Sequence, residues 1–155
     1  MALAKVRQYL KRYGADGRIK EFDVSSATVE LAAQALKCEP QRIAKTLAFK
    51  TGDGAVLIVC AGDVRVDNKK YREIFNAKAK MLSPDEVKDI VGFEIGGVCP
   101  FGVNDGVKVY LDMSLQRFAT VFPACGSANS AIELTIDELA EYSRFAAWVD
   151  VCKCG

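Results

Sequence analysis

The chain contains no histidine among its 155 residues, and this limits the chemistry that its side chains can perform. Nucleophile systems that pair serine or cysteine with histidine are excluded, and so is general-base catalysis by histidine. Neither a Walker-type phosphate loop nor a G-x-G-x-x-G fingerprint occurs, so the usual markers of nucleotide triphosphates and dinucleotide cofactors are missing. Lysine, carboxylates, hydroxyls and backbone amides remain as the groups that could do chemistry.

Lys45 is the first candidate. In a strand over residues 45–50, alternate side chains share a face, so Lys45 points the same way as Leu47 and Phe49, and Lys50 lies on the other face. An ammonium group beside an apolar layer loses hydration, and it then either pairs with an anion or serves a ligand. The alternative is a lysine at a strand end that extends into solvent.

The second candidate is the loop Gly96-Gly97-Val98-Cys99-Pro100-Phe101-Gly102. Three glycines and a proline within seven residues fix an unusual backbone path. Adjacent glycines allow backbone N–H groups to converge on an anion or a carbonyl oxygen, as in an oxyanion hole. Phe101 is expected to stack on a base or to line a small pocket. The alternative is a tight structural loop without a ligand.

The third candidate is a small polar loop, Gly126-Ser127-Ala128-Asn129-Ser130, between two predicted strands. It can supply backbone and amide donors at one end of a sheet. Taken alone, such a segment is usually only a connection.

These candidates need a scaffold, and the sequence predicts one of mixed type. Leu3, Val6, Leu10 and Tyr13 recur at helical spacing before Gly14, and Ser26 is expected to cap a second helix. Residues 45–51 and 55–61 flank Gly52-Asp53-Gly54 as a β-hairpin, whose second strand is apolar on both faces and should lie centrally.

The second half of the chain shows further start signals. A basic helix is expected from Asp67 or Asn68 to Phe75, and capping boxes occur at residues 83–86 and 135–138. Four more strands are expected, at residues 107–112, 118–122, 131–134 and 148–151. The regular alternation of a doubly wound sheet is absent. We therefore expect an α/β protein of the α+β type, a single domain over residues 1–155, with a mixed, largely antiparallel sheet or half-open barrel surrounded by helices.

Composition narrows the setting. No apolar run approaches the roughly 20 residues of a membrane helix, and we expect a cytoplasmic protein without membrane association. The six cysteines are interpreted as free thiols, and the lack of histidine argues against a metal site. Net charge is only +1, but residues 1–20 hold six basic side chains, and residues 65–80 hold six more. These segments either meet on a phosphate-binding face or are separate solvated helix faces.

The candidate stretches, in this order, resemble the YbaK-type aminoacyl-tRNA deacylase superfamily. This superfamily includes free-standing prolyl-tRNA editing proteins and the editing domain of bacterial prolyl-tRNA synthetases. The resemblance runs from about Arg18 to Val151. It is carried by Ser25-Ser26-Ala27-Thr28, Arg42-Ile43-Ala44-Lys45-Thr46-Leu47, Ala61-Gly62-Asp63, the Gly-Gly-x-x-Pro loop from Gly96 to Gly102, and the late loop from Gly126 to Ser130.

The resemblance implies a trans-editing hydrolase that deacylates a tRNA mischarged with a small amino acid, of the cysteine or alanine class, with tRNA(Pro) as the expected tRNA. It implies no cofactor and no metal. The tRNA acceptor end is the expected partner, and an aminoacyl-tRNA synthetase is a further one. The implied catalytic residues are Lys45, Gly96 and Gly97. The implied substrate contacts are Thr46, Pro100, Phe101, Gly126, Ser127 and Asn129, and Lys69, Lys70 and Arg72 are expected to contact RNA.

The sequence leaves open the identity of the nucleophile and the choice between catalysis and binding. The nucleophile is water, water assisted by a ribose hydroxyl, or the thiol of a cysteine substrate. Cys99 is interpreted as part of the pocket wall, because no base is present to activate it. The alternative function is a non-catalytic module of the same fold that binds tRNA or a synthetase.

Overall fold

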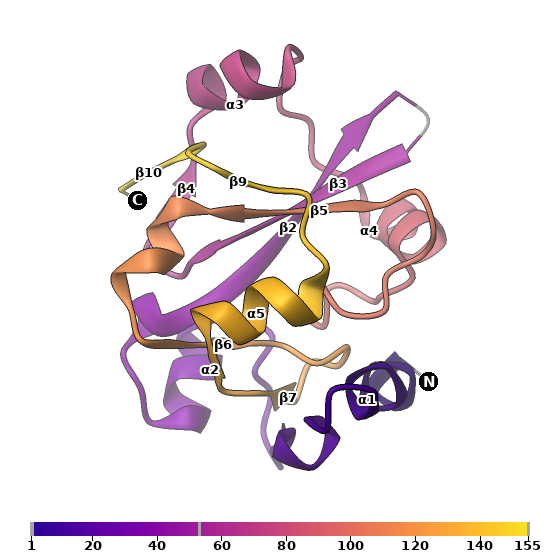
Figure 1. Cartoon of the computed structure of the whole chain (residues 1–155), viewed down its shortest axis with the longest axis vertical. Helices are drawn as coiled ribbons and strands as arrows, with labels where there is room; N and C mark the ends of the chain where they lie inside the picture. Colours follow the sequence, from indigo (N-terminus) through magenta and orange to yellow (C-terminus); the bar gives the residue numbers. More distant parts are fainter. Residues whose placement is uncertain (1, 53, 155) are drawn as a thin grey trace.

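A computed structural model describes residues 2–52 and 54–154. Its centre is a six-stranded mixed sheet in the order β8-β6-β2-β3-β5-β9, which curls into an open half-barrel (Figure 1). Two small two-stranded sheets, β1-β7 and β10-β4, flank it. The strands are β1 (Lys20–Glu21), β2 (Ile43–Thr51), β3 (Gly54–Ala61), β4 (Val64–Val66), β5 (Lys108–Asp112), β6 (Thr120–Pro123), β7 (Ser130–Ala131), β8 (Leu134–Thr135), β9 (Ala147–Val149) and β10 (Cys152–Cys154).

Five α-helices pack around the sheet in the described part of the chain (Figure 1). They are α1 (Ala2–Lys11), α2 (Val29–Leu36), α3 (Asn68–Phe75), α4 (Pro84–Glu86) and α5 (Ile136–Ser143). A π-helical turn over Val87–Val91 extends α4 to Gly92. Short 3₁₀ turns occur at Asp16–Arg18, Pro40–Arg42 and Met113–Arg117. Both predicted capping boxes are present, at Ser83 with Glu86 and at Thr135 with Glu138.

The hairpin β2–β3 forms the middle of the sheet, as the sequence predicts. Its antiparallel register runs from Ala44 opposite Ala61 to Thr51 opposite Gly54. Leu57 to Ala61 are fully buried, because both faces of β3 are covered. Asp53, in the predicted turn, lies outside the described residues.

The mixed sheet confirms the predicted fold class, and its details correct several elements. Within the six-stranded sheet, β2–β6, β3–β5 and β5–β9 are parallel. The other two pairs of that sheet, β2–β3 and β6–β8, are antiparallel, so the six-stranded sheet itself is not largely antiparallel. Antiparallel pairs outnumber parallel ones among the described strands only when β1–β7 and β10–β4 are included. The single strand expected at residues 131–134 is divided into β7 and β8, and β4 and β10 were not predicted. Strands of two or three residues are too short for a period-2 pattern to show.

Separate apolar clusters cover the two faces of the central hairpin. Ala44, Ala48, Leu57 and Val59 belong to the cluster that includes α1, α5 and the loop around Phe101. Phe49, Ile58 and Cys60 belong to the cluster that includes Tyr71 of α3. Within residues 2–52 and 54–154, no helix has both the length and the apolar content needed to cross a bilayer.

Candidate functional site

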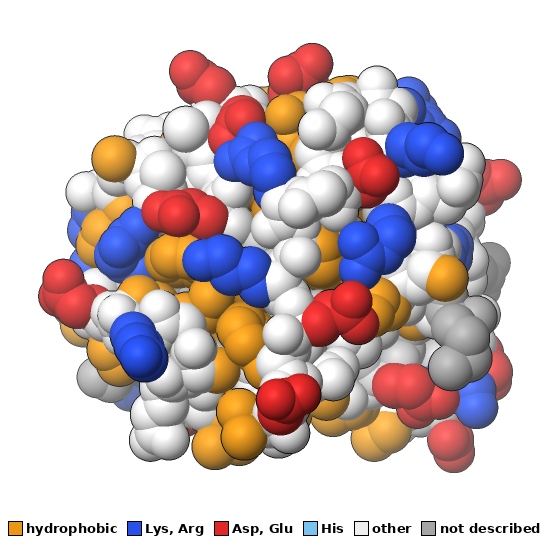
Figure 2. Space-filling view, turned by 90° about the horizontal axis from the view of Figure 1, so that it is seen from below, with side chains coloured by type: hydrophobic (Ala, Val, Ile, Leu, Met, Phe, Trp, Pro, Cys, Tyr) orange, Lys and Arg blue, Asp and Glu red, His pale blue; other side chains and the backbone are white. Residues whose placement is uncertain are grey.

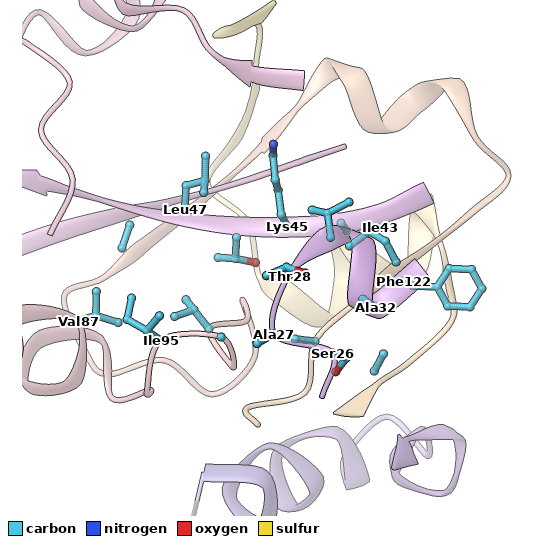
Figure 3. Close-up of a pocket in the computed structure, with 18 of the residues that line it drawn as sticks. Ser26, Ala27, Thr28, Ala32, Ile43, Lys45, Leu47, Val87, Ile95 and Phe122 are labelled. Atoms are coloured by element: carbon cyan, nitrogen blue, oxygen red, sulfur yellow. The ribbon is translucent and has the colours of Figure 1, made fainter. Parts of the chain in front are cut away.

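A cavity of about 290 Å³ lies along β2, between the loop that leads into α2 and the segment from Met81 to Val98 (Figure 3). Most of its lining is apolar, with Ile43, Leu82, Val87, Ile95 and Phe122 among the larger side chains. The polar residues in the lining are Ser26, Thr28, Lys45, Thr46 and Ser130. Small concave sites with apolar walls and a few polar groups are typical of ligand sites.

Two buried hydroxyls in this cavity lack a hydrogen-bond partner. Within the described part of the chain, Ser26 Oγ and Thr46 Oγ1 are the buried side-chain oxygens or nitrogens without one. Ser26 is only 8% exposed. An unsatisfied buried hydroxyl costs about 1–3 kcal/mol, so two of them in one cavity indicate positions that a ligand would satisfy.

The position of Ser26 differs from the predicted one. Thr28, not Ser26, is the N-cap of α2, and its side-chain oxygen accepts a hydrogen bond of 3.1 Å from the Leu31 N–H. Ser26 is held instead by its backbone N–H, which donates to the Ala128 carbonyl at 2.6 Å. The predicted Ser26 cap was therefore wrong, and the Ser26 hydroxyl is buried without a partner in a residue that lines the cavity.

The backbone of Thr46 also faces the cavity. The Ala48 carbonyl accepts from the Leu82 N–H, and the Lys50 N–H donates to the Lys80 carbonyl, both on the edge of β2 away from β3. Backbone groups of alternate residues in an antiparallel strand point to the same edge, so the Thr46 N–H and C=O point there too. In the described strands, β6 pairs with β2 at Ile43 and Ala44 and no further. The Thr46 amide is thus open to a ligand.

The Lys45 side chain extends from the face of β2 opposite to that of the Thr46 side chain. Figure 3 shows Lys45 and Leu47 extending from one side of the strand, with Ser26, Ala27 and Thr28 on the other side. The Lys45 ammonium donates to the Val64 carbonyl in β4. It has no carboxylate partner among the ion pairs of the described residues. The predicted face of Lys45 is confirmed, and the amine is partly buried rather than extended into solvent.

The two glycines of the central loop have different roles. Gly96 lines the cavity with φ +91°, a conformation that side chains other than glycine rarely adopt. The Gly97 N–H donates to the Glu94 carbonyl at 3.1 Å, so it is engaged within the turn. A Cβ on Gly97 would lie 2.8 Å from the backbone of Gly126 and Ser127. Gly97 therefore allows the two glycine loops to touch, and the expected convergence of both N–H groups on one oxygen is absent from this structure.

The remaining predicted substrate contacts lie outside the cavity lining. Phe101 is fully buried against Tyr9, so it has no surface on which a base could stack. Pro100 lines a different hollow. Asn129 donates to the Phe22 carbonyl and accepts from Ser127. Ser130 of the late loop lines the cavity together with the flanking Ala124 and Ala131, whereas Gly126, Ser127 and Asn129 are absent from the described lining.

Cys99 is a core residue. It is fully buried, and burial raises the pKa of its thiol to about 12. Its side chain is absent from the described cavity lining, and the structure gives it a weak contact from Sγ to the Phe101 carbonyl at 3.7 Å. A thiol with so high a pKa is not a nucleophile at neutral pH.

The predicted RNA-contacting residues lie on α3. Lys70 donates to Asp150 at 3.1 Å and to the Cys152 carbonyl at 3.0 Å. Lys69 and Arg72 are exposed and belong to none of the described hollows. The structure thus leaves the role of α3 as a prediction.

Known proteins resemble this chain along nearly its whole length. It is 54% identical over 154 residues to the uncharacterized protein YwhH of Bacillus subtilis (strain 168), covering 99% of this chain and 98% of the relative. It is 29% identical over 124 residues to a proline--tRNA ligase of Geobacillus sp. (strain WCH70), covering 74% of this chain but only 22% of that enzyme.

Solved structures are also similar to this chain over nearly its whole length. A protein described as a candidate trans-editing enzyme for prolyl tRNA synthetase superposes with a TM-score of 0.88 at 29% identity, covering 98% of this chain and 97% of that one. The hypothetical protein APE2540 superposes with a TM-score of 0.85 at 25% identity, covering 96% and 99%. Residues 23–142 match the family model of the aminoacyl-tRNA editing domain. The chain therefore belongs to the aminoacyl-tRNA editing domain family.

Proposed function

We propose that the protein hydrolyses the ester bond between a wrongly attached small amino acid and the 3′ end of a tRNA, with tRNA(Pro) as the first candidate. The observation that carries the proposal is the cavity along β2, where the Ser26 and Thr46 hydroxyls lack partners beside Gly96. The family relationship makes the aminoacyl end of a tRNA the natural occupant.

The cavity can hold the aminoacyl group in a defined orientation. Its apolar walls, with Ile43, Leu82 and Val87, suit a small side chain. The Ser26 and Thr46 hydroxyls and the Thr46 N–H can bind the polar atoms of the ester and the amino group. Fixing the ester in this way replaces part of the entropy loss that hydrolysis in free solution requires.

Charge stabilisation would come from Lys45 and Gly96. The Lys45 ammonium has three N–H donors, and the Val64 carbonyl uses one of them. It can bind a substrate oxygen at the strand edge by retaining or exchanging that bond. The Gly96 N–H has no backbone partner in the described part of the chain, and it can donate to the carbonyl oxygen as negative charge develops there.

The nucleophile must come from water or from the substrate, because the described lining contains no carboxylate and no cysteine. Water attacks the carbonyl carbon, the bond to the ribose oxygen breaks, and that oxygen takes the proton. The products are the free amino acid and a tRNA with a free hydroxyl. A ribose hydroxyl can assist, or the thiol of a cysteine substrate can attack first. An aminoacyl ester is already activated, so position and charge suffice.

The test is a panel of tRNA(Pro) samples charged with cysteine, alanine, serine or proline, with release of the amino acid and binding of the tRNA measured in parallel. We expect release from at least one of the three mischarged samples, with prolyl-tRNA spared. Binding without release from any sample would instead assign a non-catalytic tRNA-binding module.

A further inference from the structure

The surface of the protein carries no extended region of one charge on the face seen in Figure 2. Basic and acidic side chains are interspersed there, with hydrophobic side chains between them. The distribution of charged side chains therefore does not single out a phosphate-binding surface on this face. Cations that lack a carboxylate partner are a better guide, because carboxylates compete with phosphates for the same donors.

Two adjoining hollows away from the cavity gather such cations. Their volumes are about 470 and 330 Å³, and both include Tyr9 of α1 and Gly102 in their lining. We call them together the α1–α5 groove, since it is lined by one face of α1, the segment from Pro100 to Val109 and the end of α5. Five cations line it: Lys5, Lys11, Arg12, Lys108 and Arg144.

None of these five cations takes part in an ion pair of the described structure. Lys5 donates to the Asn104 side chain at 3.4 Å, and Arg144 donates to the Tyr13 hydroxyl at 3.3 Å. The acidic side chain in the lining is Asp105. The groove thus has an excess of unpaired positive charge in a protein of net charge +1.

The floor of the groove is aromatic. The Arg12 guanidinium lies 4.7 Å from the centre of the Tyr9 ring, which fixes the cation in place. The Tyr9 hydroxyl donates to the Tyr142 carbonyl at 2.5 Å, and burial raises the pKa of this phenol to about 12, so the neutral ring adds no charge to the groove. A planar guanidinium held against a ring is suited to bidentate phosphate contacts.

The groove and the catalytic cavity share one loop. Gly96 and Val98 line the cavity, whereas Pro100 and Gly102 line the groove, and Cys99 and Phe101 are buried between them. Six residues span at most about 20 Å. The groove and the cavity therefore lie within the length of a few nucleotides of each other.

We propose that the α1–α5 groove binds the phosphodiester backbone of the acceptor arm whose aminoacyl end occupies the cavity. This proposal rests on the proposed function, and it assigns the main RNA contact to α1 and Arg144 rather than to α3. Contacts to phosphates without base contacts would make this binding independent of sequence and sensitive to salt.

The test compares three double charge reversals, each of which changes net charge by the same amount. Lys11→Glu with Arg12→Glu alters the groove, and Lys69→Glu with Arg72→Glu alters α3. Arg65→Glu with Lys153→Glu is the control, because these residues lie opposite each other in the β4–β10 pair and keep their mutual repulsion when both are reversed. The probe is an uncharged acceptor-arm RNA hairpin, and thermal melting checks the fold of each variant.

We expect the groove variant to lose about tenfold or more in hairpin affinity and about two units of salt dependence, with the control near wild type. A loss in the groove variant no larger than in the control, or a larger loss in the α3 variant, would overturn the proposal. Deacylation at saturating tRNA separates the two proposals. If wild type binds the hairpin but hydrolyses no charged tRNA, the proposed function fails while the groove is still tested by affinity.

Discussion

The two faces of β2 carry different chemistry. On one face, the Thr46 hydroxyl is buried without a partner, in a residue that lines the cavity. On the other face, one residue earlier, the Lys45 ammonium is held by the Val64 carbonyl of β4. A strand places successive side chains on opposite sides, so a ligand can meet both groups only at the strand edge. That edge is open between the β6 pairing and the contact of Ala48 with Leu82.

The two faces are therefore expected to contribute differently to binding and to rate. The buried hydroxyl on the first face has no partner and is therefore available to a ligand, whereas the ammonium on the second face has one partner, the Val64 carbonyl, and must share or exchange that bond. Removing a group from the first face should affect binding and relieve an unsatisfied polar group. Removing the cation from the second should affect the rate most strongly.

The largest expected effect is that of Lys45→Ala on deacylation. Loss of a positioned cation that stabilises developing charge typically lowers the rate by about 100-fold or more. Lys50→Ala is the matched control, because Lys50 lies on the same strand near the turn and pairs with Glu86 at 3.6 Å. Single-turnover deacylation measures both variants. Equal rates in the two variants would remove Lys45 from the mechanism.

Thr46→Val is expected to lower deacylation less than Lys45→Ala does, without a loss of stability. Loss of one hydrogen bond to the substrate should weaken kcat/KM by about tenfold. The free energy of unfolding should be unchanged or higher, because an unsatisfied buried hydroxyl is removed.

Thr120→Val is the control for this combination of lower activity and unchanged or higher stability. The Thr120 hydroxyl donates to Glu133 at 2.7 Å and accepts from Arg42, so it is satisfied. We expect this variant to lose about 1 kcal/mol of stability and to retain its activity. Denaturant unfolding and steady-state kinetics on both variants measure the contrast. Loss of stability in Thr46→Val would show that its hydroxyl has a structural partner.

Acid stability should depend on a region that belongs to neither face of β2. Hydrogen bonds from Arg18 lower the pKa of Glu138 to about 2. A carboxylate with a lowered folded-state pKa stabilises the fold above its unfolded pKa of about 4.5, and this contribution is lost as pH falls towards 2.

Glu138→Gln should therefore flatten the fall in stability between about pH 5 and pH 2, and it retains a side chain that a capping box accepts. Thermal melting across that range gives the measurement. Deacylation at neutral pH should match wild type, and a changed neutral rate would connect this ion pair to the site.

The smallest expected effect is that of Cys99→Ala on activity. Its raised pKa and its full burial predict deacylation within about twofold of wild type, with about 1 kcal/mol of stability lost to the cavity left behind. Alkylation at pH 8 should modify the exposed Cys154 before Cys99. Loss of activity in Cys99→Ala at unchanged stability would reopen the question of a thiol nucleophile.

The sequence predicted the elements that local patterns specify. The opening helix, the central hairpin, the basic helix after Asp67 and both capping boxes were confirmed, because each depends on residues a few positions apart. The strand face of Lys45 was also confirmed, since the period of two requires nothing beyond the strand itself.

Several predictions that depended on long-range packing were wrong. Cys99 was predicted to line a pocket and Phe101 to stack on a base or line a pocket, but both are fully buried in the core cluster that includes Val6 and Leu10 of α1. Ser26 was predicted to be a cap, but its backbone N–H is bonded to the Ala128 carbonyl, a contact between segments far apart in the sequence that no local pattern predicts. The serine was nevertheless visible in the segment Ser25-Ser26-Ala27-Thr28 that carries the family resemblance, whereas Met81, Val87 and Ile95 gave no local signal as cavity lining.

The central claim is that one cavity receives the aminoacyl end between the two faces of β2. A crystal structure with a non-hydrolysable aminoacyl-adenosine amide tests it most directly. We predict the ligand in this cavity, with the Ser26 and Thr46 hydroxyls within hydrogen-bond distance of its polar atoms and the Lys45 amine in contact with it. A ligand bound elsewhere, with both hydroxyls still without partners and Lys45 still on the Val64 carbonyl alone, would contradict the claim.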